Sequence, residues 1–363
     1  MIHVERRAPL RPPVAAVVRL AGVAAALLLG GLFLAATGHP PVAAYRDMVS
    51  GALGSPYAVQ QTLIKAVPLA LTGLGVALAF HAGLWNIGAE GQLAMGACLS
   101  SWAALTLRWP GWALLPLMAG LGLLGGAAWA LIPAVPRALF GTNEIITTLL
   151  LNYVALLWVD YLVFGPWADP HAFSFPYSRP FPEAARLPLL PGTQVHLGAL
   201  CVPALALGIS VLLRSTRWGY EIRVTGSSPE AARYAGMPVR RTVVGVLVAS
   251  GAIAGLAGMI EVSGVIGRIQ QGISPGYGYA AIIIAWLARL APWATVAVAV
   301  GFAAVLNGEF ALQTSGVPAA LASILQALIL FSVLTSEFFI AHRVVLRRKR
   351  REAWVPQEVP AEP

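Results

Sequence analysis

The sequence predicts an all-α, polytopic membrane protein of about ten transmembrane helices, and three observations support this fold class. Hydrophobic residues make up 58% of the 363 positions and charged residues only 11%, whereas a soluble domain carries about 25% charged residues. The mean hydropathy is +0.74. Apolar runs also recur along the chain at the length of about 20 residues that a helix needs to cross a bilayer. Most of the outer surface must therefore face lipid.

Ten apolar runs predict the spans. The first run follows three arginines and lacks a clear cleavage site, so we expect a retained helix and not a signal peptide. The run at 279–306 is too long for one helix and is interrupted before Pro292, which predicts a tight helical hairpin. The expected spans, of which the eighth and ninth are short, are 14–37, 60–80, 84–107, 111–132, 144–164, 197–213, 242–260, 277–289, 291–306 and 319–341.

The distribution of basic residues predicts how these spans are oriented. If the N-terminus is cytoplasmic and the spans alternate, 18 Lys and Arg residues fall in cytoplasmic segments or at their edges and five in external ones. Cytoplasmic loops carry an excess of Lys and Arg, so this ratio favours a cytoplasmic position for both termini. The net charge of +9 gives little support to nucleic-acid binding, which would need a basic folded face.

The chain then divides into a cytosolic N-terminal tail at 1–13, a membrane domain at 14–341 and a basic cytosolic C-terminal tail at 342–363. Two loops within the membrane domain are long. Residues 165–196 fall outside and are rich in Pro and aromatic residues, so we expect either a rigid external cap or a docking surface for a partner. Residues 214–241 fall inside.

The inside loop encodes an isolated helix of about two turns, at 229–235. Ser228 is a suitable N-cap, Pro229 suits the first helical position, and Glu230 complements the positive end of the helix dipole. Gly236 provides a C-terminal stop. Because so short a helix is marginal alone, it needs a surface to pack against, either a pocket on another protein or the membrane surface.

Polar residues inside the apolar runs are candidates for a functional site. Asn86, Glu90 and Gln92 lie in a glycine-interrupted stretch, where an ionisable side chain must face the bundle interior or a wet cavity. The glycines permit a broken helix. A second Gly/Pro-interrupted stretch, at 272–278, opens the eighth span, and such paired interruptions are typical of inverted-repeat transporters with a midplane pathway. Glu90 and Gln92 could instead only bridge helices.

A second polar group begins the fifth span. In the simpler interpretation, Thr142 caps the helix and Glu144 complements its dipole. The alternative is a gating or substrate-path role. Asn143 belongs to the same group. Asn152, further along the span, is better placed to meet substrate or a neighbouring helix. Four other acidic residues lie near span ends, where snorkelling to water makes a charge inexpensive. These weak candidates are Asp160, Glu261, Glu309 and Glu337.

Three segments carry a resemblance to a known family. GSSPEAARYAGM, at 226–237, resembles the coupling helix of permease subunits of ATP-binding-cassette (ABC) importers. GLWNIGAEGQLAMGA, at 83–97, and GTNEIITTLLLNYVA, at 141–155, resemble the nucleoside and simple-sugar permeases of the branched-chain-amino-acid/ribose permease superfamily. The similarity covers residues 60–340. GTNE with the later LNY resembles the larger of the two paired permeases of nucleoside importers.

The resemblance implies a transport subunit, not an enzyme, that binds no cofactor and moves nucleosides or a related simple sugar by alternating access. It also implies a heterodimer with a second permease, a cytosolic ABC ATPase, an extracytoplasmic substrate-binding lipoprotein and a place in the lipid of the bacterial cytoplasmic membrane. The residues expected at the ATPase are Gly226, Ser228, Glu230, Ala231, Ala232, Arg233, Tyr234 and Gly236. Those expected along the translocation pathway are Asn86, Glu90, Gln92, Asn143, Glu144 and Asn152.

Two absences and two alternatives complete the prediction. The sequence contains no phosphate-binding P-loop, because that motif needs a lysine directly after a glycine and neither Lys65 nor Lys349 follows one. ATP would therefore be hydrolysed by another chain. Cys98 and Cys201 lie in apolar runs without a metal-binding pattern.

A sugar-specific ABC permease is one alternative to the nucleoside permease. An ion-coupled secondary transporter is the other, but it would need acidic residues stacked along the pathway, and only Glu90 lies clearly at depth.

Aromatic residues in these segments could also contact a substrate. Trp85, Tyr153 and Tyr277 could stack on a nucleobase. Packing or lipid-facing roles are commoner for such residues, so the sequence does not choose between them.

Overall fold

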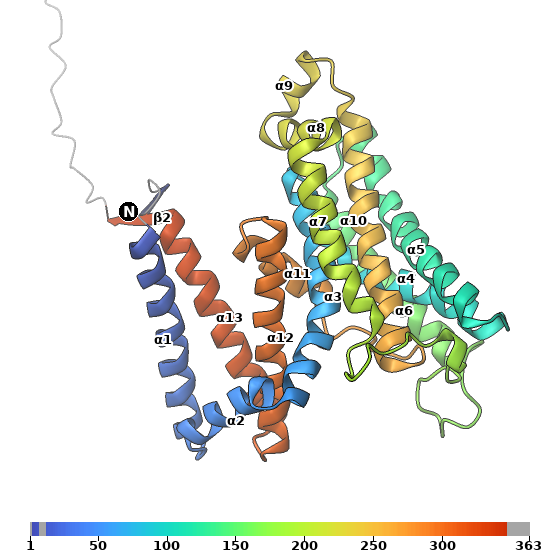
Figure 1. Cartoon of the computed structure of the whole chain (residues 1–363). Helices are drawn as coiled ribbons and strands as arrows, with labels where there is room; N and C mark the ends of the chain where they lie inside the picture. Colours follow the sequence, from blue (N-terminus) through green and yellow to red (C-terminus); the bar gives the residue numbers. More distant parts are fainter. Residues whose placement is uncertain (1, 7–11, 347–363) are drawn as a thin grey trace, which may run out of the picture. The chain divides into compact units, whose positions relative to one another are not determined.

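The computed structural model describes residues 2–6 and 12–346 and is almost entirely helical (Figure 1). Two short strands, β1 Ile2–Arg6 and β2 His342–Leu346, pair antiparallel. The predicted all-α polytopic fold class is confirmed. The α-helices are α1 Pro12–Ala36, α2 Pro41–Leu53, α3 Pro56–His81, α4 Ala89–Thr106, α5 Gly111–Phe140, α6 Glu144–Phe164, α7 Cys201–Ser215, α8 Arg217–Ser227, α9 Pro229–Tyr234, α10 Val239–Glu261, α11 Tyr277–Leu287, α12 Pro292–Thr314 and α13 Ala319–Ala341. Shorter turns are η1 Glu183–Ala185, η2 Leu197–Leu200 and the π-helical η3 Val262–Ile266.

Each of the ten predicted spans coincides with a helix. Among the described residues, seven helices are long and apolar enough to cross a membrane. The other three are α1, with a shorter apolar stretch at Leu20–Ala36, α4, with a polar beginning, and α11, with only 11 residues. At 1.5 Å per residue α11 extends about 16 Å, roughly half of the hydrocarbon thickness, so it does not cross the bilayer alone.

The predicted break before Pro292 is present. α11 ends at Leu287 and α12 begins at Pro292. Between them Arg289 and Leu290 adopt the left-handed conformation, with φ of 51° and 60°. A non-glycine residue rarely adopts this conformation, and two in succession reverse the chain within four residues.

The chain divides into two compact units, which are described separately. The first contains residues 1–41 and 324–363. In it α1 and α13 pack closely, since a Cβ at Gly22 would lie 2.7 Å from the Cβ of Ser336. The pairing of β1 with β2 places the beginning of α1 beside the end of α13. Of the predicted tails, residues 1, 7–11 and 347–363 lie outside the described residues.

The second unit, residues 42–323, is built around α3. Residues 66–79 of this helix are all buried, because α10, α11 and α12 pack around it. α4, α5 and α10 approach one another through glycines: a Cβ at Gly126 would overlap the backbone of Gly251, and one at Gly96 would overlap Gly255. Small residues permit this close approach where lipid removes the hydrophobic drive for helix association.

Within the second unit, α8 and α9 lie at one end and the loop after α6 lies at the opposite end (Figure 1). The loop is an ordered cap. Its backbone pairs with the chain that follows η3: Ser178 N donates to Ile269 O at 2.9 Å, and Phe181 N donates to Gly267 O at 2.8 Å. These bonds support the rigid-cap interpretation of residues 165–196.

Two helices, α2 and α8, were not predicted. α2 has 13 residues, and only one face, at Ala44, Met48 and Ala52, is buried. α8 is capped by Thr216, whose Oγ1 accepts a hydrogen bond from Gly219 N at 3.0 Å. Both helices are shorter than a membrane span, so a search for runs of about 20 apolar residues does not detect them.

Candidate functional site

The first interruption predicted from the sequence is an extended linker, residues 82–88, between α3 and α4. Its turn requires a left-handed Gly83, with φ of 70°. Asn86 and Gln92 exchange two amide hydrogen bonds, at 2.9 and 3.0 Å, and Asn86 Nδ2 also donates to Ser250 Oγ of α10 at 2.9 Å. Asn86 is fully buried and Gln92 nearly so. This amide pair therefore joins the linker, α4 and α10.

The second interruption, between η3 and α11, meets the first. Glu90 at the beginning of α4 accepts a hydrogen bond from Gly278 N at the beginning of α11, at 2.7 Å. Ser274 and the backbone of Gly276 also lie close enough to interact with this carboxylate. A Cβ at Gly278 would overlap the backbone of Glu90, so the helix beginnings are in direct contact. A carboxylate is stabilised at the positive end of a helix, which accounts for a buried Glu90 at this point.

Asn152 of α6 joins the same region. Its Oδ1 accepts a hydrogen bond from Gly91 N at 2.9 Å, and its Nδ2 donates to Ile87 O at 2.9 Å and to the Tyr279 hydroxyl at 3.3 Å. One fully buried side chain thus holds α4, α6, α11 and the linker together.

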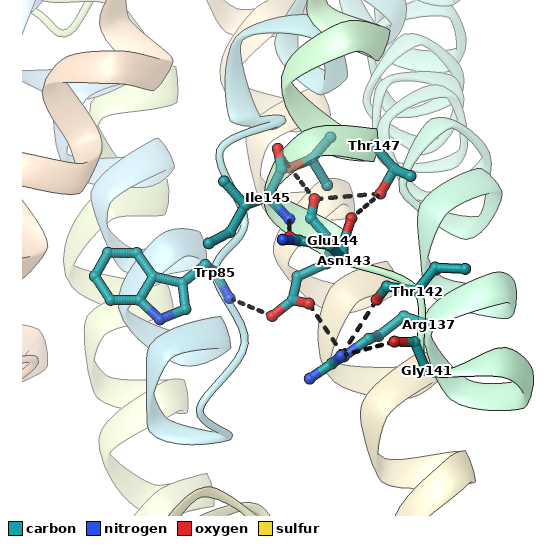
Figure 2. Close-up of polar contacts among 9 residues, drawn as sticks. Trp85, Arg137, Gly141, Thr142, Asn143, Glu144, Ile145 and Thr147 are labelled. Atoms are coloured by element: carbon teal, nitrogen blue, oxygen red, sulfur yellow. Dashed lines mark hydrogen bonds and ion pairs between the residues drawn. The ribbon is translucent and has the colours of Figure 1, made fainter.

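The turn between α5 and α6 is fastened to the linker by Glu144 (Figure 2). Its carboxylate accepts a hydrogen bond from Trp85 N at 3.3 Å and pairs with Arg137 Nε at 3.1 Å. Figure 2 shows that Arg137 also donates to the carbonyls of Gly141 and Thr142, at 3.4 and 3.2 Å. The ion pair is partly shielded, because the Glu144 side chain is only 7% exposed.

The prediction that Thr142 is the N-cap of α6 is wrong. Asn143, and not Thr142, is the N-cap, and its Oδ1 accepts a hydrogen bond from Ile145 N at 2.9 Å. The Thr142 hydroxyl is buried without a hydrogen-bond partner in the described part of the chain. Two adjacent side chains of similar capping propensity precede Glu144, and only the backbone path decides which one reaches the free amides.

Glu261 also differs from expectation. A position near a span end predicted snorkelling, yet Glu261 is only 6% exposed. α10 continues into η3, and the cap packs beyond it, which removes the water that the carboxylate would reach. Lys65 of α3 lies close enough for its charge to interact with Glu261 and Glu309, and its ammonium stands 5.7 Å from the centre of the Phe310 ring.

Most of the predicted pathway residues share one property. Five of the six are buried, and Asn143 is the exposed one. The hydrogen bonds of Asn86, Glu90 and Asn152 go to the backbone and side chains of neighbouring segments. In the structure these polar residues bridge helices, and their place along a translocation pathway stays a prediction. Ser250 and Ser274, which contact Asn86 and Glu90, were not identified from the sequence, because they come from distant segments and no local spacing relates them. Arg137, the partner of Glu144, is close in sequence, but it lies across the turn between α5 and α6.

The short helix of the inside loop is present as α9, one residue shorter than predicted. Ser228 Oγ accepts a hydrogen bond from Ala231 N at 3.2 Å, and Gly236 adopts the left-handed stop with φ of 75°. Tyr234 is 95% exposed, whereas Ala232 is completely buried within the second unit. The expectation that Ala232 faces a partner is therefore wrong, and the exposed side of α9 is defined by Tyr234.

α8 connects this helix to the linker. A Cβ at Gly83 would lie 3.3 Å from Gly226 O, and one at Gly226 would overlap the carbonyl of His81. The two backbones can touch because both residues lack a side chain. α8 and the linker that carries Trp85 and Asn86 are therefore in direct backbone contact.

Broken helices that meet inside a helical bundle, beside an exposed short helix at one end, define a multi-pass membrane transport protein. Residues 58–334 match the family described as branched-chain amino acid transport system / permease component. The match covers more than half of the chain, so the chain belongs to this family. It is an ABC transporter permease, a transport subunit and not an enzyme, and such a subunit works with further subunits.

Several relatives share almost the full length. The glucose ABC transporter permease protein TsgB13 of Haloferax volcanii is 42% identical over 91% of this chain and 90% of its own length. The guanosine ABC transporter permease protein NupP of Bacillus subtilis is 31% identical over 88% and 93%. The nucleoside ABC transporter permease protein NupB of Lactococcus lactis is 28% identical over 87% and 90%. No solved structure matches this chain.

Proposed function

We propose that this chain is one of two different permeases of an ABC importer for simple sugars or nucleosides. The observation that carries the proposal is the contact between the helix beginnings of α4 and α11 at Glu90 and Gly278. Paired broken helices at the bundle centre are typical of alternating-access transporters. The relatives named for glucose, guanosine and nucleosides support a substrate with a ring and several hydroxyl groups. The 42% identity to a glucose permease favours a sugar, and the GTNE and LNY segments favour a nucleoside.

We assign α9 to docking on the ATPase. Glu230, Arg233 and Tyr234 are exposed on it. Ala231 and Gly236 are also exposed, whereas Ser228 caps the helix and Gly226 contacts the linker. A docked helix needs both an exposed anchor and a rigid connection to the moving part. Tyr234 supplies the first, and the glycine contact between α8 and the linker supplies the second.

The orientation follows from the basic residues. Both termini, α8 and α9 are placed in the cytoplasm of a bacterial cell, and the cap at 165–196 is placed outside, where a substrate-binding lipoprotein would deliver its ligand. The pairing of β1 with β2 supports a common side for the two termini, because it brings the beginning of α1 and the end of α13 together within the first unit.

Vesicle transport tests the proposal. The chain is co-expressed with its second permease, ATPase and binding protein, and uptake of radiolabelled glucose and guanosine is measured in right-side-out vesicles loaded with ATP. We expect uptake of one of the two compounds that requires ATP and resists an ionophore. Competition with unlabelled sugars and nucleosides then ranks the substrates. Uptake that persists without ATP and collapses with the ionophore would reject the proposal in favour of ion-coupled transport.

A further inference from the structure

One face of α11 carries two exposed aromatic residues. Tyr279 and Trp286 are seven residues apart, which is about two helical turns, so they share a face and are separated by about 10 Å along the helix. They are 36% and 47% exposed, respectively. The neighbouring Tyr277, which the sequence offered as a stacking residue, is only 4% exposed and packs inside. Helical periodicity thus separates two tyrosines, two positions apart, into a core residue and a surface residue.

Aromatic residues of three other segments converge on this face. The ring centre of Trp85, from the linker 82–88, lies 5.6 Å from that of Trp286 and 5.1 Å from that of Phe80 at the end of α3. Trp85 is 40% exposed. Tyr153 of α6 is exposed and follows Asn152, whose Nδ2 donates to the Tyr279 hydroxyl. We call Tyr153, Tyr279, Trp85 and Trp286 the aromatic track.

The depth of Tyr153 argues against a lipid-facing role for this residue. Tyr153 is the tenth of the 21 residues of α6, so its hydroxyl lies near the middle of the span. Tyrosine is enriched at the membrane interfaces, where its hydroxyl reaches water. A polar group facing hydrocarbon at mid-depth is costly and normally lines a protein or water-filled surface. The exposed half of Tyr153 therefore faces something more polar than lipid tails.

Tyr279 presents a hydrogen-bond donor to the same side. Its oxygen accepts a hydrogen bond from Asn152 Nδ2 at 3.3 Å. The hydroxyl proton remains available for another acceptor, because Asn152 uses its own oxygen on Gly91 N. The ring face of Trp286 lies two turns further along. A ring compound with hydroxyl or carbonyl groups can satisfy both features at once.

We propose that the aromatic track is the substrate-contacting surface of this permease, with Trp286 and Trp85 stacking on the ring of a sugar or nucleoside and Tyr279 donating to one of its oxygen atoms. Aromatic faces stack on nucleobases with little dependence on the base. The buried polar residues then position the track: Asn152 orients Tyr279, and Glu144 holds Trp85 through its backbone. The proposal rests on the proposed function and names the substrate-binding residues.

Substitution of Trp286 tests the stacking role. In the vesicle assay, we expect Trp286→Ala to lower ATP-driven uptake at least tenfold while ATP hydrolysis by the assembled complex continues. Trp286→Phe keeps an aromatic face and should retain most of the uptake. Trp293→Ala is the matched control, because Trp293 of α12 is 51% exposed and lies outside the track; it should transport like the unmodified protein. Normal uptake by Trp286→Ala would overturn the proposal.

Thiol chemistry tests whether the track faces the pathway. Tyr279→Cys, in a chain with Cys98 and Cys201 replaced by alanine, should react with a water-soluble, membrane-impermeant thiol reagent in opened membranes. The transported compound, glucose or guanosine, should slow this reaction. Leu207→Cys is the control: Leu207 of α7 is 56% exposed on an apolar helix and should not react.

The outcomes separate the two proposals. If the Tyr279→Cys variant does not react, or if substrate does not slow its reaction, the proposed role of the aromatic track is overturned. If the unmodified complex shows ATP-driven uptake in the same preparation, the importer proposal stands even when the track fails. If the unmodified complex shows no ATP-driven uptake, the importer proposal itself fails.

Discussion

At the residue scale, the buried polar side chains act as connectors between helix beginnings. Glu90 is 2% exposed and accepts from the backbone of α11, so its charge is balanced by the helix dipole and by hydrogen bonds. A buried acceptor of this kind is costly to remove, because the donor that it satisfied stays buried. The bond between Glu90 and Gly278 therefore determines how firmly the two broken helices hold together.

Substitution of Glu90 should lower stability in a graded way. Glu90→Ala leaves Gly278 N unsatisfied and should cost about 1–3 kcal/mol, whereas Glu90→Gln keeps an acceptor oxygen and should cost less. Thermal unfolding of the detergent-purified protein measures both. Glu230→Gln, at an exposed position of α9, is the control and should change little. Equal stability of Glu90→Ala and the unmodified protein would show that the bond does not hold the helices.

His196, at the edge of the cap, predicts a dependence on pH. The side chain is 1% exposed, and neither ring nitrogen has a hydrogen-bond partner in the described part of the chain. Burial lowers the pKa of His196 below its ordinary value of 6.5. Because the unfolded state then binds the proton more readily, this group favours folding above about pH 6.5 and opposes it as the pH falls below that value.

We therefore expect the melting temperature to decrease between about pH 7 and pH 5, and His196→Leu to reduce that decrease. His171→Leu, at an exposed position of the same loop, should leave the pH dependence unchanged. Thermal unfolding across this pH range is the measurement. A pH dependence that is identical with and without His196 would show that another group is responsible.

At the scale of elements, α9 combines an exposed aromatic side chain with a buried alanine. Tyr234 projects into solvent, and Ala232 packs against the chain itself. Small residues on a short amphipathic helix do not reveal which side is buried, because alanine suits both. Substitutions of Tyr234 and of Ala232 should therefore have different effects.

Tyr234→Ala should leave the permease folded and in the membrane but reduce co-purification of the ATPase and ATP-driven uptake severalfold, because an exposed aromatic anchor is lost. Ala232→Glu places a charge in a buried site and should lower the yield of folded protein itself. Affinity purification with tagged ATPase, together with a melting curve, separates the two effects. Tyr161→Ala, at an exposed position of α6, is the control and should change neither measurement. Full ATPase recovery with Tyr234→Ala would contradict the docking role of α9.

At the scale of the whole molecule, two independent observations support the proposal that both termini lie on one side of the membrane. Lys and Arg residues divide 18 to five between the two predicted sides. The antiparallel pairing of β1 with β2 also requires the two chain ends to meet. Both observations demand an even number of crossings. α11 is too short to cross alone, so a crossing at this point needs the irregular segment 267–276 before it as well.

Cysteine labelling checks this orientation. An impermeant thiol reagent added to intact cells should label Ser174→Cys, on the exposed cap, but not Ser227→Cys at the end of α8. Ser178 would be a poor probe despite its place in the loop, because it is fully buried and its Oγ accepts from Ile269 N. Permeabilised cells should label both positions. The opposite pattern in intact cells would place α9 outside and remove its assignment to the ATPase.

The sequence by itself determined the helical class, the ten apolar segments, the Ser228-capped helix and the two glycine-broken stretches. Each of these depends on local composition, on hydropathy over a helix length, or on the cap and stop residues of one turn. The contact between Glu90 and Gly278, the burial of Glu261 and Ala232, and the exposure of Tyr279 in place of Tyr277 became known only from the three-dimensional packing. These facts depend on which distant segments pack together, and apolar helices of similar composition carry little information about their neighbours.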